Sequence, residues 1–369
     1  MATQVGTAAS ETIIVISASD VVYGLDGNDR LQSAFANTFW YGGQGNDLLF
    51  ATTAGAYGDM YGGAGNDWLY SAGNTANDDM YGGEGNDVLH KAGTGGATME
   101  GGSGTDAIYG GGGNDRLYGG EDNDTNTVNV TAGTGAGAST TTNAGGLYGG
   151  AGNDNLYGGR GTDYLDGGAD DDFLYGGGQN DVMYGGSGLD FLNGGGGEDE
   201  LHGGAGDDEV NGDRGNDTMY GDSENDMMFG GVGDDTMYGG TGDDYMKGDD
   251  GNDILSGGLG KNKMWGGDGD DAFLFDVTPV AGTKAIIKDF KPGTDELWLD
   301  STIFSAVGGK VGKKEFYEGK NAKDGNDHFI YKGEKKLYWD VDAKGGADKV
   351  LIAKFEKGTS LDHHDFMVI

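Results

Sequence analysis

The residues best suited to chemistry are aspartates that recur at nearly every ninth position between Gly149 and Leu274. They stand sixth in units with the pattern Gly-Gly-x-Gly-x-Asp-x-U-x, in which U is a large apolar residue. Glycines tolerate positive φ, so such a turn can direct several carbonyl oxygens at one point. Together with the carboxylate they make an anionic, all-oxygen site, which suits calcium and offers no soft ligand for zinc or copper. The spacing therefore predicts a series of calcium sites.

We expect the ligands to be the sixth-position aspartates, in the fourteen regular units and in looser units before them, together with backbone carbonyls of the turn glycines. The aspartates are Asp29, Asp47, Asp67, Asp87, Asp106, Asp115, Asp154, Asp163, Asp172, Asp181, Asp190, Asp199, Asp208, Asp217, Asp226, Asp235, Asp244, Asp253 and Asp271. The carbonyls are those of Gly150, Gly152, Gly159, Gly161, Gly186, Gly188, Gly204, Gly206, Gly240 and Gly242. On the order of 10–20 calcium ions would then bind one chain.

The composition indicates that cations are required for folding. The chain has 369 residues, a net charge of −39, 81 glycines and only 35% hydrophobic residues, which is close to the composition of a disordered protein. The same charge excludes nucleic acid and anionic membrane surfaces as partners, because like charges repel. The chain has no cysteine, so disulfides and thiolate metal sites are excluded. No segment reaches the roughly 18 apolar residues that a membrane-spanning helix needs.

The repeated unit, such as GGAGNDNLY at residues 149–157, resembles the calcium-binding nonapeptide of RTX (repeats-in-toxin) proteins, over nearly the whole chain. The resemblance implies an all-β fold, a parallel β-roll, in which each ion is held between turns one full coil apart. The last three residues of each unit then form a short strand with U directed inward, and two sheets pack face to face.

Because one coil contains two units, the resemblance sorts the regular aspartates into two rows. One row contains Asp154, Asp172, Asp190, Asp208, Asp226 and Asp244, and the other contains Asp163, Asp181, Asp199, Asp217, Asp235, Asp253 and Asp271. The first row meets Asn262 at its next step, where an uncharged ligand predicts a weakened or absent ion. Six residues replace turn glycines and predict strained turns or extra carboxylate ligands: Asp170, Gln179, Asp213, Asp222, Glu224 and Asp249.

The inward positions form a thin apolar core. They are Leu156, Leu165, Leu174, Met183, Leu192, Leu201, Val210, Met219, Met228, Met237, Met246, Leu255, Met264 and Phe273. The run of methionines could be interpreted as a track for a soft metal, but we interpret it as core, because methionine adapts well to a narrow sandwich.

Four regions follow from the spacing of the units. They are 1–20, an N-terminal strand or cap; 21–148, an irregular β-roll with lengthened coils and an insertion at 121–148; 149–275, the regular β-roll; and 276–369, a C-terminal capping and secretion-signal region. A strand is expected at Thr12 to Ile16. The insertion is rich in threonine, alanine and glycine, and is either a neutral loop or a contact or glycan-bearing loop.

The composition changes after Leu274, and seventeen of the nineteen lysines lie at or after Lys261. Runs at 285–287, 297–299 and 337–339 predict ordinary strands. The tail resembles the C-terminal region of RTX proteins exported by type I secretion, in the segments 287–290, 295–299, 337–340 with Asp342, and 365–369. This resemblance implies an uncleaved secretion signal, the type I secretion machinery as a partner, and a secreted, extracellular or cell-surface location. It agrees with the absence of any lysine or arginine before Arg30, which a Sec-type signal peptide would need.

We expect no enzymatic activity. The sequence contains no HExxH zinc site, no cysteine nucleophile and no phosphate-binding loop. His363, His364 and Asp365 could form a metal or acid–base cluster, but we interpret them as part of a solvated terminal strand. Most carboxylate pairs are explained by calcium.

The outward positions leave two functions open. Aromatic residues gather there, namely Tyr157, Tyr175, Tyr184, Tyr220, Phe229, Tyr238 and Trp265. They could bind glycans or a neighbouring molecule, or simply favour strands. We expect a secreted calcium-binding structural protein that folds on calcium outside the cell and self-assembles into a surface layer (S-layer), filament or matrix. The alternative is an extracellular adhesin or a module that binds cell-surface polysaccharide. A cytotoxin or hydrolase accessory is disfavoured, since no membrane-inserting or catalytic segment is found.

Overall fold

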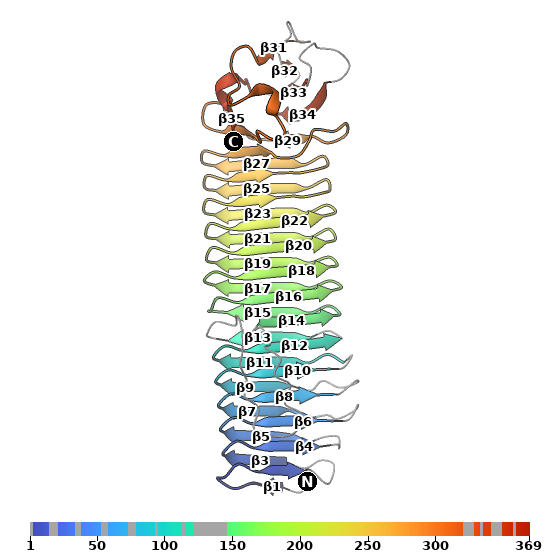
Figure 1. Cartoon of the computed structure of the whole chain (residues 1–369), viewed down its shortest axis with the longest axis vertical. Coiled ribbons are helices and arrows are strands. Elements are labelled where there is room, and N and C mark those ends of the chain that lie inside the picture. The colour runs from blue at the N-terminus through green and yellow to red at the C-terminus, as the bar shows by residue number, and fades with distance from the viewer. Residues whose placement is uncertain are drawn as a thin grey trace. The chain divides into compact units, whose positions relative to one another are not determined.

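The chain is all-β and forms a parallel β-roll, as the computed structural model in Figure 1 shows. The structure describes residues 3–14, 21–33, 38–52, 58–72, 79–92, 95–112, 115–120, 146–319, 328–332, 335–340, 349–356 and 359–369. Two compact units are present, Met1–Gly195 and Gly196–Ile369. Within the described residues no helix is long and apolar enough to cross a membrane.

The first unit contains two parallel sheets whose strands alternate along the chain. One sheet contains β1 (Thr3–Val5), β3 (Val21–Asp26), β5 (Phe39–Gln44), β7 (Met60–Ala64), β9 (Met80–Glu84), β11 (Thr98–Ser103), β13 (Arg116–Gly120), β15 (Asn155–Gly159) and β17 (Phe173–Gly178). The other contains β2 (Thr12–Ile14), β4 (Arg30–Ser33), β6 (Leu48–Ala51), β8 (Trp68–Ser71), β10 (Val88–Lys91), β12 (Ala107–Gly112), β14 (Gly146–Ala151), β16 (Tyr164–Ala169) and β18 (Val182–Ser187). Strand β19 (Phe191–Gly196) ends at the boundary between the units.

The second unit continues this pattern and adds a cap. One sheet contains β21 (Glu209–Arg214), β23 (Met227–Val232), β25 (Tyr245–Asp250), β27 (Lys263–Asp268) and β29 (Ala285–Ile287). The other contains β20 (Glu200–Ala205), β22 (Thr218–Ser223), β24 (Thr236–Tyr238), β26 (Ile254–Ser256), β28 (Ala272–Phe275), β30 (Glu296–Leu299) and β35 (Phe366–Val368). The cap contains η1 (Ser305–Val307), β31 (Phe316–Glu318), β32 (Phe329–Lys332), β33 (Lys336–Trp339), β34 (Val350–Phe355) and η2 (His363–Asp365).

Identical repeat positions of successive coils lie side by side. Leu156 pairs with Leu174 and Gly159 with Gly177, one coil of 18 residues later. Every inward residue predicted from the repeat is buried, the methionines included, which confirms that the methionine run is core. Parallel pairing in register is therefore set by the position of U, because a slip of one residue would turn each apolar side chain outward.

The cap ends the parallel stacking of one sheet. Strand β34 pairs with β29 in parallel, whereas β33 pairs antiparallel with both β34 and β32. An aromatic cluster joins Phe329 of β32 and Trp339 of β33 to Phe304, with all three rings in mutual contact. The predicted strands at 285–287, 297–299 and 337–339 are confirmed.

One predicted boundary shifts. Strand β14 begins at Gly146, inside the range assigned to the insertion, because Leu147 fills the inward position next to Ile108 of the preceding coil. Residues 121–145 of the insertion lie outside the described residues. The opening strand covers Thr12–Ile14, and the rest of its predicted range is also outside them.

Candidate calcium sites

Each sixth-position aspartate links its turn to the turn one coil earlier. In the first unit the backbone N–H of Asp154 donates to Oδ1 of Asp172, and that of Asp172 donates to Oδ1 of Asp190, both at 2.8 Å. In the second unit the N–H of Asp217 donates to Asp235 at 2.8 Å. The predicted rows are thus present within each unit, with neighbouring carboxylates one coil apart.

The second oxygen of each carboxylate has a different environment. All nineteen predicted aspartates make interactions through their other atoms, such as Oδ1 and the backbone N–H. Their Oδ2 atoms, however, are buried and accept no hydrogen bond. Asp172, Asp226 and Asp235 are examples, each at most 3% exposed. A buried anionic oxygen without a partner carries a desolvation cost that a bound cation would offset.

A backbone carbonyl meets this oxygen beside the first glycine of the turn. A Cβ atom added to Gly167 would lie 2.4 Å from Oδ2 of Asp172 and 2.7 Å from the carbonyl oxygen of Gly185. At Gly221 the corresponding distances, to Asp226 and Gly239, are 2.4 and 2.7 Å. Oδ2 and a carbonyl oxygen of the next coil therefore lie close together beside the first glycine, as two oxygen ligands of one Ca²⁺ ion would. The site would be blocked by any side chain, so the first position must be glycine.

The second and fourth turn positions meet a different constraint. Nine of the ten glycines predicted to offer carbonyl ligands have φ between +94° and +146°. The carbonyl oxygen of Gly150 lies 2.2 Å from where a Cβ of Gly168 would stand, so these carbonyls point along the row. The first-glycine carbonyls, which sequence reasoning did not include, are the ones that converge with Oδ2. The pattern itself held the signal, since both leading glycines are nearly invariant among the units.

The residues that replace glycines keep the glycine backbone. Asp170, Gln179, Asp213, Asp222, Glu224 and Asp249 all have φ between +72° and +77°. This left-handed conformation costs a residue with a Cβ roughly 1–2 kcal/mol. The predicted backbone strain is therefore confirmed at these turns.

The rows end where the chemistry of the turn changes. The N–H of Asp244 donates to Oδ1 of Asn262 at 2.9 Å, but the amide nitrogen of Asn262 donates to the carbonyl of Gly257 instead of presenting a second oxygen. In the cap, Oδ1 of Asp295 accepts from Asp271 at 3.3 Å and its Oδ2 accepts from Lys291 at 2.7 Å. Asn262 and Asp295 thus still accept a backbone N–H through Oδ1, as the aspartates of the rows do. Their second polar atom, however, already takes part in another hydrogen bond. Sequence reasoning missed the place of Asp295 in the row, because the tail departs from the nine-residue spacing.

A second ladder runs beside the first in the opposite sense. The N–H of Asn46 donates to the side chain of Asn28, and that of Asn66 to the side chain of Asn46, both at 2.9 Å. The same pattern links Asn225 to Asp207 in the second unit at 2.9 Å. These fifth-position side chains lie on the outside of the turn. They were missed in the sequence, although asparagine or aspartate fills this position in many units.

Burial raises the pKa of Asp172, Asp226 and Asp235 to about 8, and neighbouring carboxylates add to the effect. The hydrogen bond that each Oδ1 accepts from the preceding coil acts in the opposite direction. A row of such groups binds either protons or cations at neutral pH. The donor set contains only oxygen and matches calcium in hardness and charge.

Of three comparisons with known proteins, the match to a family model agrees with this site. A family model, the RTX calcium-binding nonapeptide repeat (4 copies), matches residues 5–37, 59–89, 92–125, 148–183, 184–219, 211–246, 220–255 and 247–275, more than half of the chain. No curated protein matches. Among solved structures, the AlgE6R3 subunit of the Azotobacter vinelandii mannuronan C5-epimerase is 27% identical to the chain, covering 40% of this chain and 80% of that one, with a TM-score of 0.28. The match to the family model confirms that the repeats are of a calcium-binding type, several copies of which follow one another.

The substitution Asp226→Asn tests the assignment of ligands. It keeps an Oδ1 acceptor for the N–H of Asp208 but removes the anionic Oδ2, so we expect the loss of one or two calcium ions per chain in equilibrium dialysis with metal analysis. Asp207→Asn is the matched control. Asp207 is exposed, and its Oδ1 accepts a hydrogen bond from the N–H of Asn225, which an asparagine oxygen can also do. Equal ion counts for wild type and Asp226→Asn would contradict the assignment.

The raised pKa values give the calcium-free chain a predictable response to pH. The folded pKa values, up to about 8, exceed the unfolded value of 3.8, so protonation favours the folded state at low pH and the effect is lost as pH rises through 6 to 8. In chelator we expect more β-structure by circular dichroism, and a smaller radius of gyration, at pH 5 than at pH 8. Millimolar calcium should remove the difference. A calcium-free chain that is equally compact at both pH values would refute this linkage.

Proposed function

The chain belongs to the RTX calcium-binding repeat family, and we propose that it is a secreted structural protein that folds on calcium outside the cell and assembles with copies of itself. The observation that carries the proposal is the set of buried Oδ2 atoms, since it makes folding depend on a cation. The type I secretion route and the extracellular location are supported by the resemblance of the tail to exported RTX proteins.

The magnitudes favour a calcium switch. Extracellular calcium modules bind with dissociation constants of about 10⁻⁴ to 10⁻³ M. At ten times that concentration each ion contributes about 1.4 kcal/mol, so roughly ten ions would contribute about 14 kcal/mol. This equals the whole stability of an ordinary domain. The chain would remain unfolded in a cytosol with little free calcium and would fold after export.

Exposed edge strands support self-assembly. Among the described residues, β2 pairs only with β4 and β35 only with β30. The side chain of Ile14 is 62% exposed on β2, and Ile369 next to β35 is 47% exposed. Unpaired strand edges with apolar side chains are templates for a further strand.

The two edges differ, and this favours open-ended assembly. Contact between β35 of one copy and β2 of the next joins two different surfaces, and such heterologous contacts generate filaments when they do not close into rings. The distribution of charge also favours contact between the carboxy-terminal region of one copy and the amino-terminal region of the next, since only the latter is strongly acidic. Residues 276–369 contain fifteen lysines and sixteen acidic residues, whereas residues 1–275 contain eight basic and forty-six acidic residues. We expect no catalytic activity from either part.

A glycan-binding role is the second candidate, and an interruption in a ladder of aromatic rings favours it. Tyr23, Tyr41, Tyr61 and Tyr81 stack with ring centroids 4.8–5.0 Å apart, so their ring faces cover one another. Glu100 takes the next position in the register and breaks the ladder.

Beyond this break the strands offer a concave surface. Tyr118 pairs in register with Glu100 and stacks on Tyr157 on its other side, with centroids 5.2 Å apart. A hollow of about 550 Å³ is lined by Glu100, Tyr118, Tyr157 and adjacent glycines. An aromatic face beside a carboxylate in a concave site suits the apolar face and hydroxyl groups of a neutral sugar.

Electron microscopy of the refolded protein tests self-assembly. In millimolar calcium we expect ordered filaments or sheets that disappear on chelation. Ile14→Lys should abolish them, because a charge on an edge strand opposes pairing. Leu189→Lys is the matched control, since Leu189 is 59% exposed on a turn. Dispersed monomers that fold with calcium would overturn the assembly proposal.

A screen against neutral oligosaccharides tests the second candidate. Tyr118→Ala should weaken binding at least tenfold, because it removes the ring face beside Glu100. Tyr41→Ala should leave binding unchanged, since Tyr41 is stacked on both sides. Absence of any binding, or equal losses in both variants, would count against a glycan site in this hollow.

A further inference from the structure

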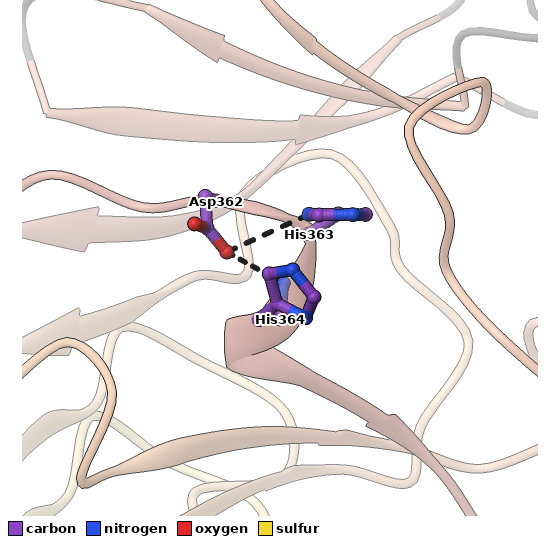
Figure 2. Close-up of side chains that lie close together, drawn as sticks. All are labelled: Asp362, His363 and His364. Atoms are coloured by element: carbon purple, nitrogen blue, oxygen red, sulfur yellow. Dashed lines mark hydrogen bonds and ion pairs between the residues drawn. The ribbon is translucent and has the colours of Figure 1, made fainter.

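A cluster of side chains that could hold a metal ion lies near the end of the chain and contains none of the aspartates of the rows. Asp362, His363 and His364 offer ligand atoms that all lie within 4.8 Å of one another, and no second group of this kind occurs among the described residues. Figure 2 shows the three side chains at the start of η2, with the two imidazole rings beside the carboxylate of Asp362, the residue that precedes this helix. The ring centroids are 3.9 Å apart, and Nδ1 of His363 is 3.6 Å from Oδ1 of Asp362.

The sequence interpretation of this segment was wrong in two respects. His363 and His364 lie in a 3₁₀ helix and not in a solvated strand. The carboxylate beside them is Asp362, because Asp365 is 3% exposed and already bonded. Its Oδ1 accepts from the N–H of Gly293 at 3.0 Å and its Oδ2 from that of Asp362 at 2.6 Å.

The backbone holds this turn in place. A capping box joins Asp362 and Asp365, and the N–H of His364 donates to Oδ1 of Asp362 at 2.6 Å. Strand β35, which follows at once, pairs with β30. The second oxygen of Asp362 and the exposed ring of His364 remain on the solvent side. The three donors are thus positioned by backbone hydrogen bonds, and only side-chain rotation is needed to bring them together.

We propose that Asp362, His363 and His364 bind a first-row divalent transition metal, with zinc the best fit. Two imidazole nitrogens and a carboxylate oxygen make up a common three-ligand zinc set, which leaves a fourth position for water or for a donor from another molecule. Calcium takes oxygen ligands and gains little from imidazole. Zinc–ligand bonds of about 2.0–2.2 Å require donor atoms about 3.4 Å apart, a modest closing of the present cluster.

His202 provides an internal comparison. It also lies between acidic side chains, but its Nε2 is 3.1 Å from Glu200 and its Nδ1 is 3.6 Å from Asp222. Opposite ring nitrogens face the two carboxylates, so these donors do not converge on one point. This cluster of one histidine and two carboxylates therefore lacks the geometry for a shared ion.

The test uses the full chain in millimolar calcium, which occupies the aspartate rows. Titration with Co²⁺ should give visible absorption bands that saturate at one ion per chain and disappear when Zn²⁺ is added. His363→Gln and His364→Gln should each weaken binding at least tenfold, and His202→Gln should leave it unchanged. Circular dichroism checks that each variant folds.

A second readout needs no variant. Zn²⁺ should shift the imidazole proton resonances of two histidines in the nuclear magnetic resonance spectrum of the wild-type chain. Loss of those two signals in the corresponding variants assigns them to His363 and His364. The proposal is overturned if cobalt gives no bands in excess calcium, or if binding persists in both glutamine variants.

Discussion

The structure depends on the different roles of the two oxygens in each aspartate carboxylate of the rows. One oxygen accepts a backbone N–H from the preceding coil, as Asp172 does from Asp154 at 2.8 Å. The other is buried beside the first glycine without a hydrogen bond. The first interaction holds successive turns together, and the second creates a need for a cation. Neither is satisfied in an isolated unit, so the repeats are stable only when stacked.

The glycines and the thin core follow from this arrangement. Any side chain at Gly167 would collide with the carboxylate of Asp172, and the carbonyl of Gly185 approaches the same point. Each strand, such as the six-residue β17, carries only one large apolar side chain that faces inward, here Leu174. So little apolar burial per coil provides limited stability, and the ions must supply a large share of the remainder.

Much of this could be predicted because the sequence is periodic. A fixed nine-residue spacing determines which aspartates stack and which side chains face inward, and both sets were identified residue by residue. The direction of Oδ2 and the opposite ladder through Asn46 depend on the path of the turn, which composition does not reveal. The cap was the least predictable part. The role of Asp295 and the turn at His363 depend on contacts between segments far apart in the sequence, such as Gly293 with Asp365.

The opposite senses of the two ladders make the two sides of each coil chemically different. A buried aspartate amide is satisfied only by the coil that follows it, whereas an exposed fifth-position amide relies on the coil before it and can bind water instead. Removal of a coil on the amino-terminal side leaves the buried Oδ1 acceptors of the next coil without donors, whereas removal on the other side leaves buried N–H donors without acceptors. In the second unit the last of these donors, the N–H of Asp271, is satisfied by Oδ1 of Asp295. The two sides of a coil therefore differ in the groups that a neighbouring coil must satisfy, acceptors on one side and donors on the other.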